Sequence, residues 1–285
     1  MSRIAYVDGR YVPHFAAAVH IEDRGYQFAD AVYEVCAVWG GEIVDFDPHV
    51  RRLRRSLNEL RIPFTMGSPA LWAIMRETVR RNRINNGIVY LQISRGQARR
   101  DHGFPRAAHP VLVVTARDIS FDSIEARAKQ GVAVVSTPDI RWRRCDIKSV
   151  SLLPNILAKQ IARDAEAFEA WFVDDDGAVT EGTSTNAWIV DKKGNLTTRY
   201  LDNAILGGIT REVVLDIAGR TGLGLVERAF TIDEAKTARE AFVTSTTSLV
   251  LPVTMIDGEL IADGKPGPIS SKLFDGYKHR LASMT

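Results

Sequence analysis

Short β-prone segments and amphipathic helical segments alternate along all 285 residues of this chain, without internal repeats or low-complexity tracts. In the first half a hairpin is predicted to turn at Asp8-Gly9, and a helix is predicted to begin with Asp47 as its cap and Pro48 in its first turn. Further strands are predicted at 32–39, 42–44, 87–94 and 111–116, and a second helix at about 69–82. Helices interleaved with mixed strands predict an α/β fold.

The second half repeats this alternation in a different order. Strands are predicted near 132–136, 169–174 and 186–190, helices near 154–167 and 210–220, and a last hairpin at Asp257-Gly258. The weakest pattern lies at about 118–122. We therefore predict an N-terminal α/β domain over 1–118, a linker over 119–122 and a larger C-terminal domain over 123–285.

Composition restricts the possible partners. Hydrophobic residues make up 45% of the chain, which is enough for a substantial core, and the net charge is only +2 with both signs mixed. This gives no reason to expect nucleic acid or a membrane as partner. Cys36 and Cys145 match no metal-ligand spacing, and the histidines form no ligand group, so no metal site is predicted. The N-terminus from Met1 shows no signal peptide, so a soluble cytoplasmic protein is expected.

Lys148 and the later acid Glu181 indicate which chemistry the chain can perform. The chain has nine lysines against 28 arginines, and Lys148 is the lysine that a surface turn or a polar helix explains least well. Glu181 opens a glycine-bearing, hydroxyl-rich turn that runs to Asn186. A lysine can form a Schiff base with an aldehyde cofactor, and a buried carboxylate can keep that cofactor's ring nitrogen protonated. The pairing predicts pyridoxal 5′-phosphate, although most lysines in proteins only solubilise a surface.

Such a cofactor needs a phosphate site, and two segments could supply one. Gly207-Gly208-Ile209-Thr210-Arg211 leads into a predicted helix whose free N–H groups can bind an anion, with Thr210 adding a hydroxyl. The same run is also an ordinary helix start with Thr210 as cap. A second hydroxyl cluster spans 244–248, and Arg52, beside the apolar face of its helix, offers a fork of donors.

Together these segments resemble the fold type IV pyridoxal-phosphate enzymes, and within them the D-amino acid aminotransferases. The resemblance covers nearly the whole chain and rests on 24–30, 33–35, 49–53, 146–149, 181–186, 209–211 and 244–248. It implies two domains with the cofactor at their interface and Lys148 as the Schiff-base lysine. It also implies a set of further cofactor-binding residues, namely Arg52, Glu181, Ile209, Thr210 and Thr246.

The resemblance also implies the substrate class. In D-amino acid aminotransferases an Arg-X-His motif, here Arg100-Asp101-His102, joins a tyrosine, here Tyr33, in binding the substrate α-carboxylate, and Thr247 is expected to assist. Arg100 and His102 are expected to enter the site of the partner subunit of a homodimer. The implied reaction moves the amino group of a D-alanine-like amino acid to a 2-oxo acid such as 2-oxoglutarate. It is expected to be ping-pong, through an internal aldimine at Lys148.

Several alternatives remain open from the sequence. A branched-chain L-amino acid aminotransferase would share the cofactor site and leave Arg100 and His102 as charges on a mobile loop. A lyase of the aminodeoxychorismate type would release pyruvate without a second oxo acid. A non-catalytic binding protein could keep the phosphate-binding hydroxyls and dispense with Lys148 or Glu181, and both are present here. Ala29 and Ala31 stand where family members often have glycine, and Ala37 where a longer polar residue is familiar, so no single donor is named.

Overall fold

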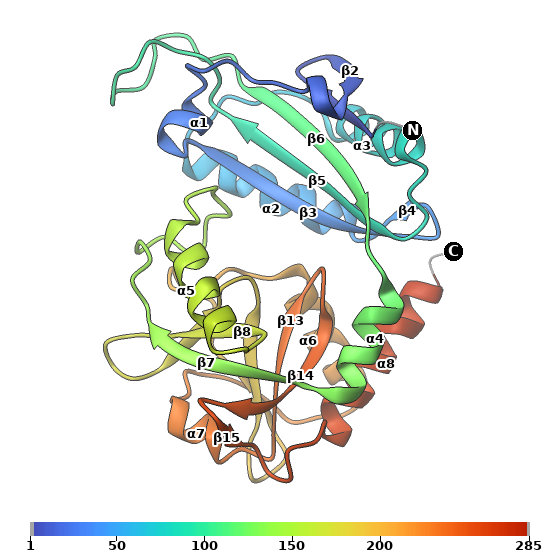
Figure 1. The fold of residues 1–285 in the computed structure, drawn as a ribbon, viewed down its shortest axis with the longest axis vertical. Helices are drawn as coiled ribbons and strands as arrows, with labels where there is room; N and C mark the ends of the chain where they lie inside the picture. Colours follow the sequence, from blue (N-terminus) through green and yellow to red (C-terminus); the bar gives the residue numbers. More distant parts are fainter. Residues whose placement is uncertain (1–2, 284–285) are drawn as a thin grey trace. The chain divides into compact units, whose positions relative to one another are not determined.

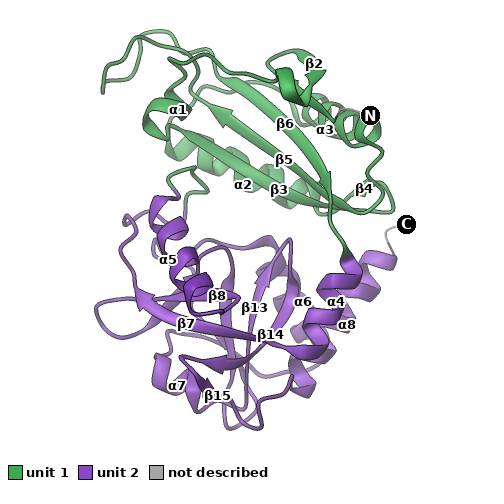
Figure 2. Cartoon of the chain, viewed as in Figure 1, with its two compact units in different colours: residues 1–120, 147–151, 284–285 green, residues 121–146, 152–283 purple. Residues whose placement is uncertain are grey.

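The computed structural model describes residues 3–283. Met1 and Ser2, with which the N-terminal segment considered above begins, lie outside the described residues. The chain forms two compact units (Figure 2). Unit 1 contains the residues up to Ser120 together with 147–151, and unit 2 contains 121–146 and 152–283. The division falls inside the predicted linker, but Phe121 and Asp122 already form the first turn of helix α4 (Phe121–Gln130). Acidic residues favour a helix start, so Asp122 suits the helix better than a linker.

Unit 1 is built on one antiparallel sheet with strand order β2-β1-β6-β5-β3-β4 (Figure 1). The predicted hairpin at Asp8-Gly9 joins the first two strands of the chain, and both turn residues have positive φ, as a tight hairpin turn requires. The strands are β1 (Ile4–Val7), β2 (Arg10–Pro13), β3 (Ala31–Trp39), β4 (Glu42–Ile43), β5 (Gly87–Ser94) and β6 (Val111–Asp118).

Two long helices cover this sheet. Helix α2 (Phe46–Glu59) contacts β3, and α3 (Ser68–Asn82) contacts β1 and β6. The remaining helical segments of unit 1 are short, η1 (His14–Ala16) and α1 (Arg24–Phe28). The prediction that Asp47 caps α2 is wrong, because Asp45 occupies the N-cap position in the left-handed conformation without a side-chain cap. Asp47 lies instead in the first turn, where its charge favours the helix dipole.

Unit 2 contains a mixed sheet with strand order β12-β11-β10-β13-β14-β7-β8-β9, and β15 pairs with β14. The pairs β11·β12, β14·β7 and β7·β8 are parallel, and the other pairs are antiparallel. The strands are β7 (Val132–Pro138), β8 (Glu169–Val173), β9 (Val179–Gly182), β10 (Asn186–Val190), β11 (Leu196–Thr198), β12 (Leu225–Glu227), β13 (Glu240–Ser245), β14 (Leu249–Ile256) and β15 (Glu259–Leu260).

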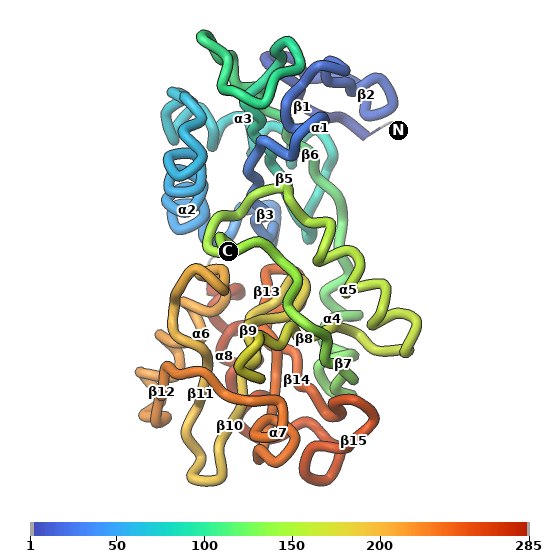
Figure 3. Tube along the Cα trace, turned by 90° about the vertical axis from the view of Figure 1, so that its left-hand side faces the viewer, coloured from blue at the N-terminus to red at the C-terminus, as the bar shows by residue number. Residues whose placement is uncertain are grey.

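The helices of unit 2 pack on this sheet. Helix α5 (Leu153–Asp164) contacts β7 and β8, while α6 (Ile209–Arg220) and α8 (Pro268–Ala282) lie side by side (Figure 3) and α7 (Ile232–Lys236) is short. Trp171, Trp188 and Phe242 are fully buried among the strands. No helix within residues 3–283 combines the length and the apolar composition that a membrane crossing requires. Two sheets with interleaved helices confirm the predicted α/β class.

Candidate active site

Lys148 is fixed against the edge of β3 in unit 1. Its carbonyl accepts a hydrogen bond of 3.0 Å from the Tyr33 amide, and its own amide donates to the Ser56 hydroxyl over 3.2 Å. Ser149 forms a bridge with Val32, which continues the pairing by one residue. The Lys148 Nζ lies 4.2 Å from the centre of the Tyr33 ring. The structure therefore brings together the predicted amine and the predicted tyrosine, and a π face attracts the ammonium form.

The Tyr33 ring is itself held in place. It stacks on Tyr90 with 5.7 Å between ring centres, and the Tyr90 hydroxyl donates to Gln92 Oε1 over 2.7 Å. Burial, and then the neighbouring Tyr33, raises the pKa of Tyr90 to about 12. Tyr90 thus remains a neutral hydroxyl, and the sequence offered no signal for it beyond its place on β5.

Arg52 makes a buried ion pair that the sequence analysis did not identify. Its Nε and Nη2 donate to the two oxygens of Glu34 over 2.8 and 2.7 Å, and His49 Nδ1 lies 2.7 Å from the same carboxylate. The Glu34 side chain is 0% exposed. Burial alone would raise the pKa of Glu34, but the charge and hydrogen bonds of Arg52, with help from His49, lower it to about 2. Glu34 therefore stays ionised and fixes the plane of the guanidinium.

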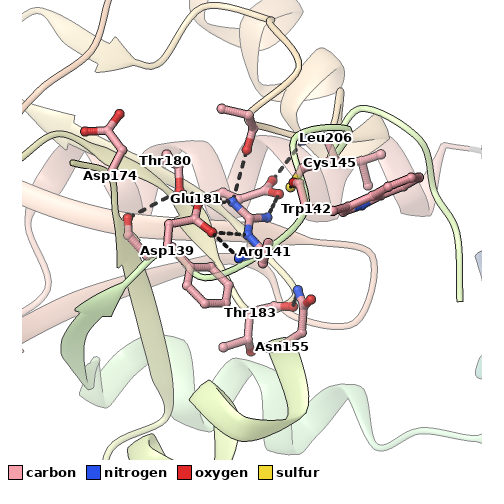
Figure 4. A network of polar contacts seen from close by, with 12 residues as sticks. Asp139, Arg141, Trp142, Cys145, Asn155, Asp174, Thr180, Glu181, Thr183 and Leu206 are labelled. Carbon is pink, nitrogen blue, oxygen red and sulfur yellow. Dashed lines mark hydrogen bonds and ion pairs between the residues drawn. The ribbon is translucent and has the colours of Figure 1, made fainter. Parts of the chain in front are cut away.

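Glu181 lies on β9 at the centre of a polar network in unit 2 (Figure 4). Its carboxylate accepts from Arg141 Nη1 over 2.5 Å, from the Leu206 amide over 3.0 Å and from Asn186 Nδ2 over 3.2 Å. Donors on several sides, one of them a guanidinium, favour the ionised carboxylate. Arg141 was missed because it stands in a run of four basic or aromatic residues, 141–144, whose pattern is typical of a solvated loop.

Arg141 is held by more than Glu181. Its side chain is 4% exposed, and its Nε and Nη2 donate to Asp139 over 2.9 and 2.7 Å. Burial opposes the charge of Arg141, but hydrogen bonds to Asp139 and the charge of Glu181 raise its pKa. Burial also works against the charge of Asp139, whose pKa the hydrogen bond and charge of Arg141 nevertheless lower. Burial raises the pKa of Cys145 to about 12, so this neighbour remains a thiol.

The hydroxyl-rich turn after Glu181 is ordered by a second buried acid, Glu169. Thr183 donates to its carboxylate, as do the Ser184 and Thr185 hydroxyls over 3.2 and 3.3 Å. A side chain at Gly182 would place its Cβ 2.2 Å from Thr185 Oγ1, so only glycine fits there. These three hydroxyls therefore have a structural partner, which the sequence pattern did not reveal.

The start of α6 has the features of an anion site. Gly208 is its N-cap and no side chain caps the helix, while Thr210 is buried inside the first turn. The alternative prediction that Thr210 serves as the cap is thus wrong. A Cβ on Gly208 would lie 2.1 Å from Asn186 Oδ1. Because Asn186 also bonds to Glu181 and to the Leu206 carbonyl, the α6 start and the Glu181 network are parts of one arrangement.

The second hydroxyl segment forms the turn between β13 and β14. Asn186 and Thr244 are partners in the β10·β13 ladder, which brings this turn beside the α6 start. The Thr244 hydroxyl accepts from Trp188 Nε1 over 3.0 Å and so is already used, whereas Thr246 is half-buried and Thr247 exposed. An uncapped helix start with two nearby threonine hydroxyls is a donor set that fits a phosphate group.

Arg100 and His102 lie on the exposed loop between β5 and β6 in unit 1. The Arg100 guanidinium carbon is 4.8 Å from the centre of the Phe28 ring, and the His102 and Phe28 ring centres are 5.6 Å apart. The structure therefore brings the Arg-X-His pair together on one aromatic residue. Phe28 belongs to a segment that the sequence analysis matched as a whole, without assigning it a role.

Comparison with known proteins gives consistent findings. The family described as Amino-transferase class IV matches residues 31–256. A D-alanine aminotransferase of Bacillus licheniformis is 40% identical over 278 residues, which cover 98% of this chain and 97% of that protein.

Solved structures are similar over the same extent. A branched-chain aminotransferase of the archaeon Thermoproteus uzoniensis with norvaline has a TM-score of 0.87 and 28% identity, covering 99% of this chain and 95% of that one. The branched-chain amino acid aminotransferase of Thermobaculum terrenum in its PLP form has a TM-score of 0.87 and 24% identity, with 100% and 95% covered.

Proposed function

Since this chain belongs to the class IV amino-transferase family, we propose that it moves the amino group of a D-alanine-like D-amino acid to a 2-oxo acid such as 2-oxoglutarate. It is a transaminase and its cofactor is pyridoxal 5′-phosphate. The observation that carries the D-amino acid assignment is the pair Arg100 and His102, both held on Phe28, in a chain 40% identical to a D-alanine aminotransferase.

The residues that would hold the cofactor differ in what they supply. Bound pyridoxal phosphate supplies an aldehyde that takes up amino groups and a ring that accepts electron density from the substrate's α-carbon. Lys148 supplies the amine that attaches the aldehyde. The phosphate would be held by the Arg52 guanidinium, by the first turn of α6 at Ile209 and Thr210, and by the Thr246 hydroxyl. A guanidinium, a helix start and a hydroxyl are donors that a phosphate prefers.

Two groups of the chain then handle protons. With the cofactor bound, the Lys148 amine would serve as the general base and acid that moves the substrate's α-proton. Its backbone pairing with β3 and its position at the Tyr33 ring restrict the reach of the amine. Glu181 would hold a proton on the ring nitrogen, and the Arg141 cation beside it favours the charged carboxylate that this task requires.

Arg100 and His102, with Tyr33 and Thr247, bind the substrate α-carboxylate in this proposal. An arginine and a histidine two residues apart offer several N–H donors to one carboxylate, and a carboxylate held there fixes which face of the α-carbon meets Lys148. This arrangement distinguishes the proposal from a branched-chain L-amino acid aminotransferase, the class of the solved structures.

We further propose that the enzyme is a homodimer whose Arg100 and His102 enter the partner's site. Helix α5 supports this proposal. Its residues Ala158 and Ala162 are buried, whereas the opposite face is exposed and apolar. That face consists of Leu153, Ile156, Leu157 and Ile161. A contiguous exposed apolar stripe is typical of an interface. Ile156→Glu should shift the sedimenting species to the monomer, while Leu225→Glu, an exposed leucine on β12, should not.

The experiment that tests the reaction uses purified protein with pyridoxal phosphate and no oxo acid. D-alanine and L-leucine are added separately, and the absorption of the bound cofactor is followed until it reaches the pyridoxamine form. Conversion by D-alanine alone supports the proposal. Conversion by L-leucine alone assigns the branched-chain reaction, and pyruvate released from a chorismate-derived amine without an oxo acid assigns the lyase.

A further inference from the structure

We propose that Phe28 is a positioning residue for substrate specificity, whose ring holds Arg100 and His102 as one preformed carboxylate-binding pair. This inference rests on the proposed function, because it assumes that the pair binds the α-carboxylate. Phe28 is the last residue of helix α1, far from the loop in sequence, and no part of the reaction described above requires it.

Three side chains meet at the Phe28 ring. The guanidinium carbons of Arg100 and Arg24 each lie 4.8 Å from its centre, and His102 lies at 5.6 Å with its ring tilted by 47°. A cation at this distance from a ring centre is attracted by the negative π face. One aromatic side chain therefore defines where both members of the Arg-X-His motif lie, although both are exposed to solvent.

Arg24 and Arg100 share the ring but use their donors differently. Arg24 is buried, and its Nε donates to Asp30 over 2.8 Å while its Nη1 donates to the Asp101 carbonyl over 2.6 Å. Within residues 3–283, no group accepts a hydrogen bond from the Arg100 guanidinium or bonds to the His102 ring. The π face attracts Arg100 without occupying its N–H groups, which stay available for a carboxylate.

The base of this arrangement is rigid. Burial alone would raise the pKa of Asp30, but hydrogen bonds from Arg95 and Arg24 lower it, so both arginines face a permanent anion. Arg95 also donates to the carbonyls of Leu60 and Arg61, over 2.6 and 2.8 Å. Its guanidinium carbon lies 3.8 Å from the centre of the Phe104 ring, two residues beyond His102. The loop is thus attached at Asp101 and at Phe104, on either side of His102.

Because the loop backbone is attached on both sides of His102, the Arg100 side chain is the part of the carboxylate-binding pair that still has to be ordered. Arginine has many rotamers, and ordering it on binding costs free energy. Phe28 orders the Arg100 side chain before the substrate arrives. Binding the carboxylate then needs less ordering, so the substrate is bound more tightly. The consequence belongs to substrate binding, so it is expected in KM and much less in kcat.

The test compares two substitutions of Phe28. Phe28→Leu keeps the apolar bulk and removes the π face, whereas Phe28→Tyr keeps the ring. With D-alanine as donor, Phe28→Leu is expected to raise KM about two- to fivefold, the size of one exposed cation–π contact, with little change in kcat. Phe28→Tyr is expected to retain the wild-type KM. An unchanged KM in Phe28→Leu, or an equal rise in Phe28→Tyr, overturns the proposal.

A second measurement does not depend on activity. Amide hydrogen exchange over residues 97–104 of the cofactor-free protein reports the order of the loop. Exchange there is expected to be faster in Phe28→Leu than in the wild type and unchanged in Phe28→Tyr, with residues of α3 as an internal reference. Equal exchange in all variants shows that the ring does not order the loop and overturns the proposal.

The two proposals fail in different ways. If wild-type protein does not react with D-alanine, the proposed function is wrong, whatever the Phe28 variants do. If the wild type reacts and Phe28→Leu matches it in both KM and exchange, the function stands and the role of Phe28 is wrong.

Discussion

Arg141 and Glu181 form a nearly buried ion pair in which Arg141 Nη1 donates to the Glu181 carboxylate over 2.5 Å. The remaining donors of Arg141 bind Asp139, Thr180 and the Ala204 carbonyl. One arginine thus fixes the orientation of the acid proposed to hold the cofactor's ring nitrogen, and it links the loop before Lys148 to strand β9.

Arg141→Met should destabilise the protein strongly, because two carboxylates would be left without their cation in a buried place. Removing one partner of a buried ion pair typically costs about 3–5 kcal/mol. Urea unfolding measures this loss. Arg220→Met is the matched control, since Arg220 pairs with Asp216 on the surface of α6 and such pairs contribute about 0–1 kcal/mol. Similar losses of unfolding free energy in the two variants would show that the ion pairs of Arg141 are exposed to solvent.

Acid should unfold the protein partly through Glu34. Its pKa is about 2 in the folded chain against an ordinary 4.5, so its stabilising effect is complete above about pH 4.5 and disappears as the pH falls towards 2. The shift corresponds to about 3 kcal/mol. The pKa of His49 is lowered, chiefly by burial, so the unfolded chain binds this proton first and stability also falls with pH below its ordinary 6.5.

Thermal unfolding between pH 7 and pH 3 tests this expectation. Glu34→Gln should lower the melting temperature at pH 7 and make its fall with decreasing pH shallower than in the wild type. Glu42→Gln, which changes an exposed carboxylate on β4, should leave the wild-type slope intact. If the melting temperatures of the wild type and of Glu34→Gln fell with pH at the same rate, Glu34 would not be the group whose protonation destabilises the folded chain.

Ala29→Gly should stabilise the chain. Ala29 ends helix α1 in the left-handed conformation, with φ 56° and ψ 25°. The left-handed conformation costs a residue with a Cβ about 1–2 kcal/mol, and glycine avoids this cost. The unfolded state of the glycine variant is more flexible, however, and this offsets part of the gain in stability. The net gain is about 0.5–1 kcal/mol by urea unfolding. Ala31→Gly, two residues later in β3 and fully buried, should destabilise instead, because it only removes a packed methyl group.

Gly208→Ala should weaken cofactor binding and Gly207→Ala should not. A Cβ at 208 would lie 2.1 Å from Asn186 Oδ1, whereas one at 207 would be at an ordinary 3.7 Å from Leu201. Asn186 cannot retreat without giving up its bonds to Glu181 and to the Leu206 carbonyl. Overpacking of this kind costs about 1–3 kcal/mol. Titration of the cofactor-free variants with pyridoxal phosphate gives the dissociation constants, and equal constants would place the phosphate away from α6.

Lys148→Ala should abolish turnover while leaving noncovalent binding of pyridoxal phosphate, because the phosphate-binding groups remain. Borohydride reduction followed by mass spectrometry of the peptides locates the covalent attachment without an activity assay. The wild type should carry the cofactor on Lys148, and so should Lys272→Ala, which changes a lysine on α8. Attachment to another lysine, or near-normal turnover of Lys148→Ala, would end this assignment.

Local patterns predicted most of the regular elements. The hairpins at Asp8-Gly9 and Asp257-Gly258 and the helices over 69–82 and 210–220 were visible, because turn residues and apolar periodicity act within a few residues. The short strands β9, β11 and β12 were not predicted. Each has only three or four residues, too few for a period, and each is a strand because its neighbours in the sheet pair with it.

The residues of the candidate site also fall into those that local sequence indicated and those that became visible only in the folded chain. Local segments were sufficient to propose the reactive groups Lys148, Glu181 and the Arg100-His102 pair, because the chemistry of each is carried by a single side chain in a recognisable segment. The neighbours of these groups became visible only in the folded chain: Arg141 beside Glu181, Glu34 beside Arg52, Glu169 beside the hydroxyl turn and Phe28 beside Arg100. These partners lie 14 to 72 positions apart in the chain. Burial makes such pairings strong, and burial is a property of the folded chain.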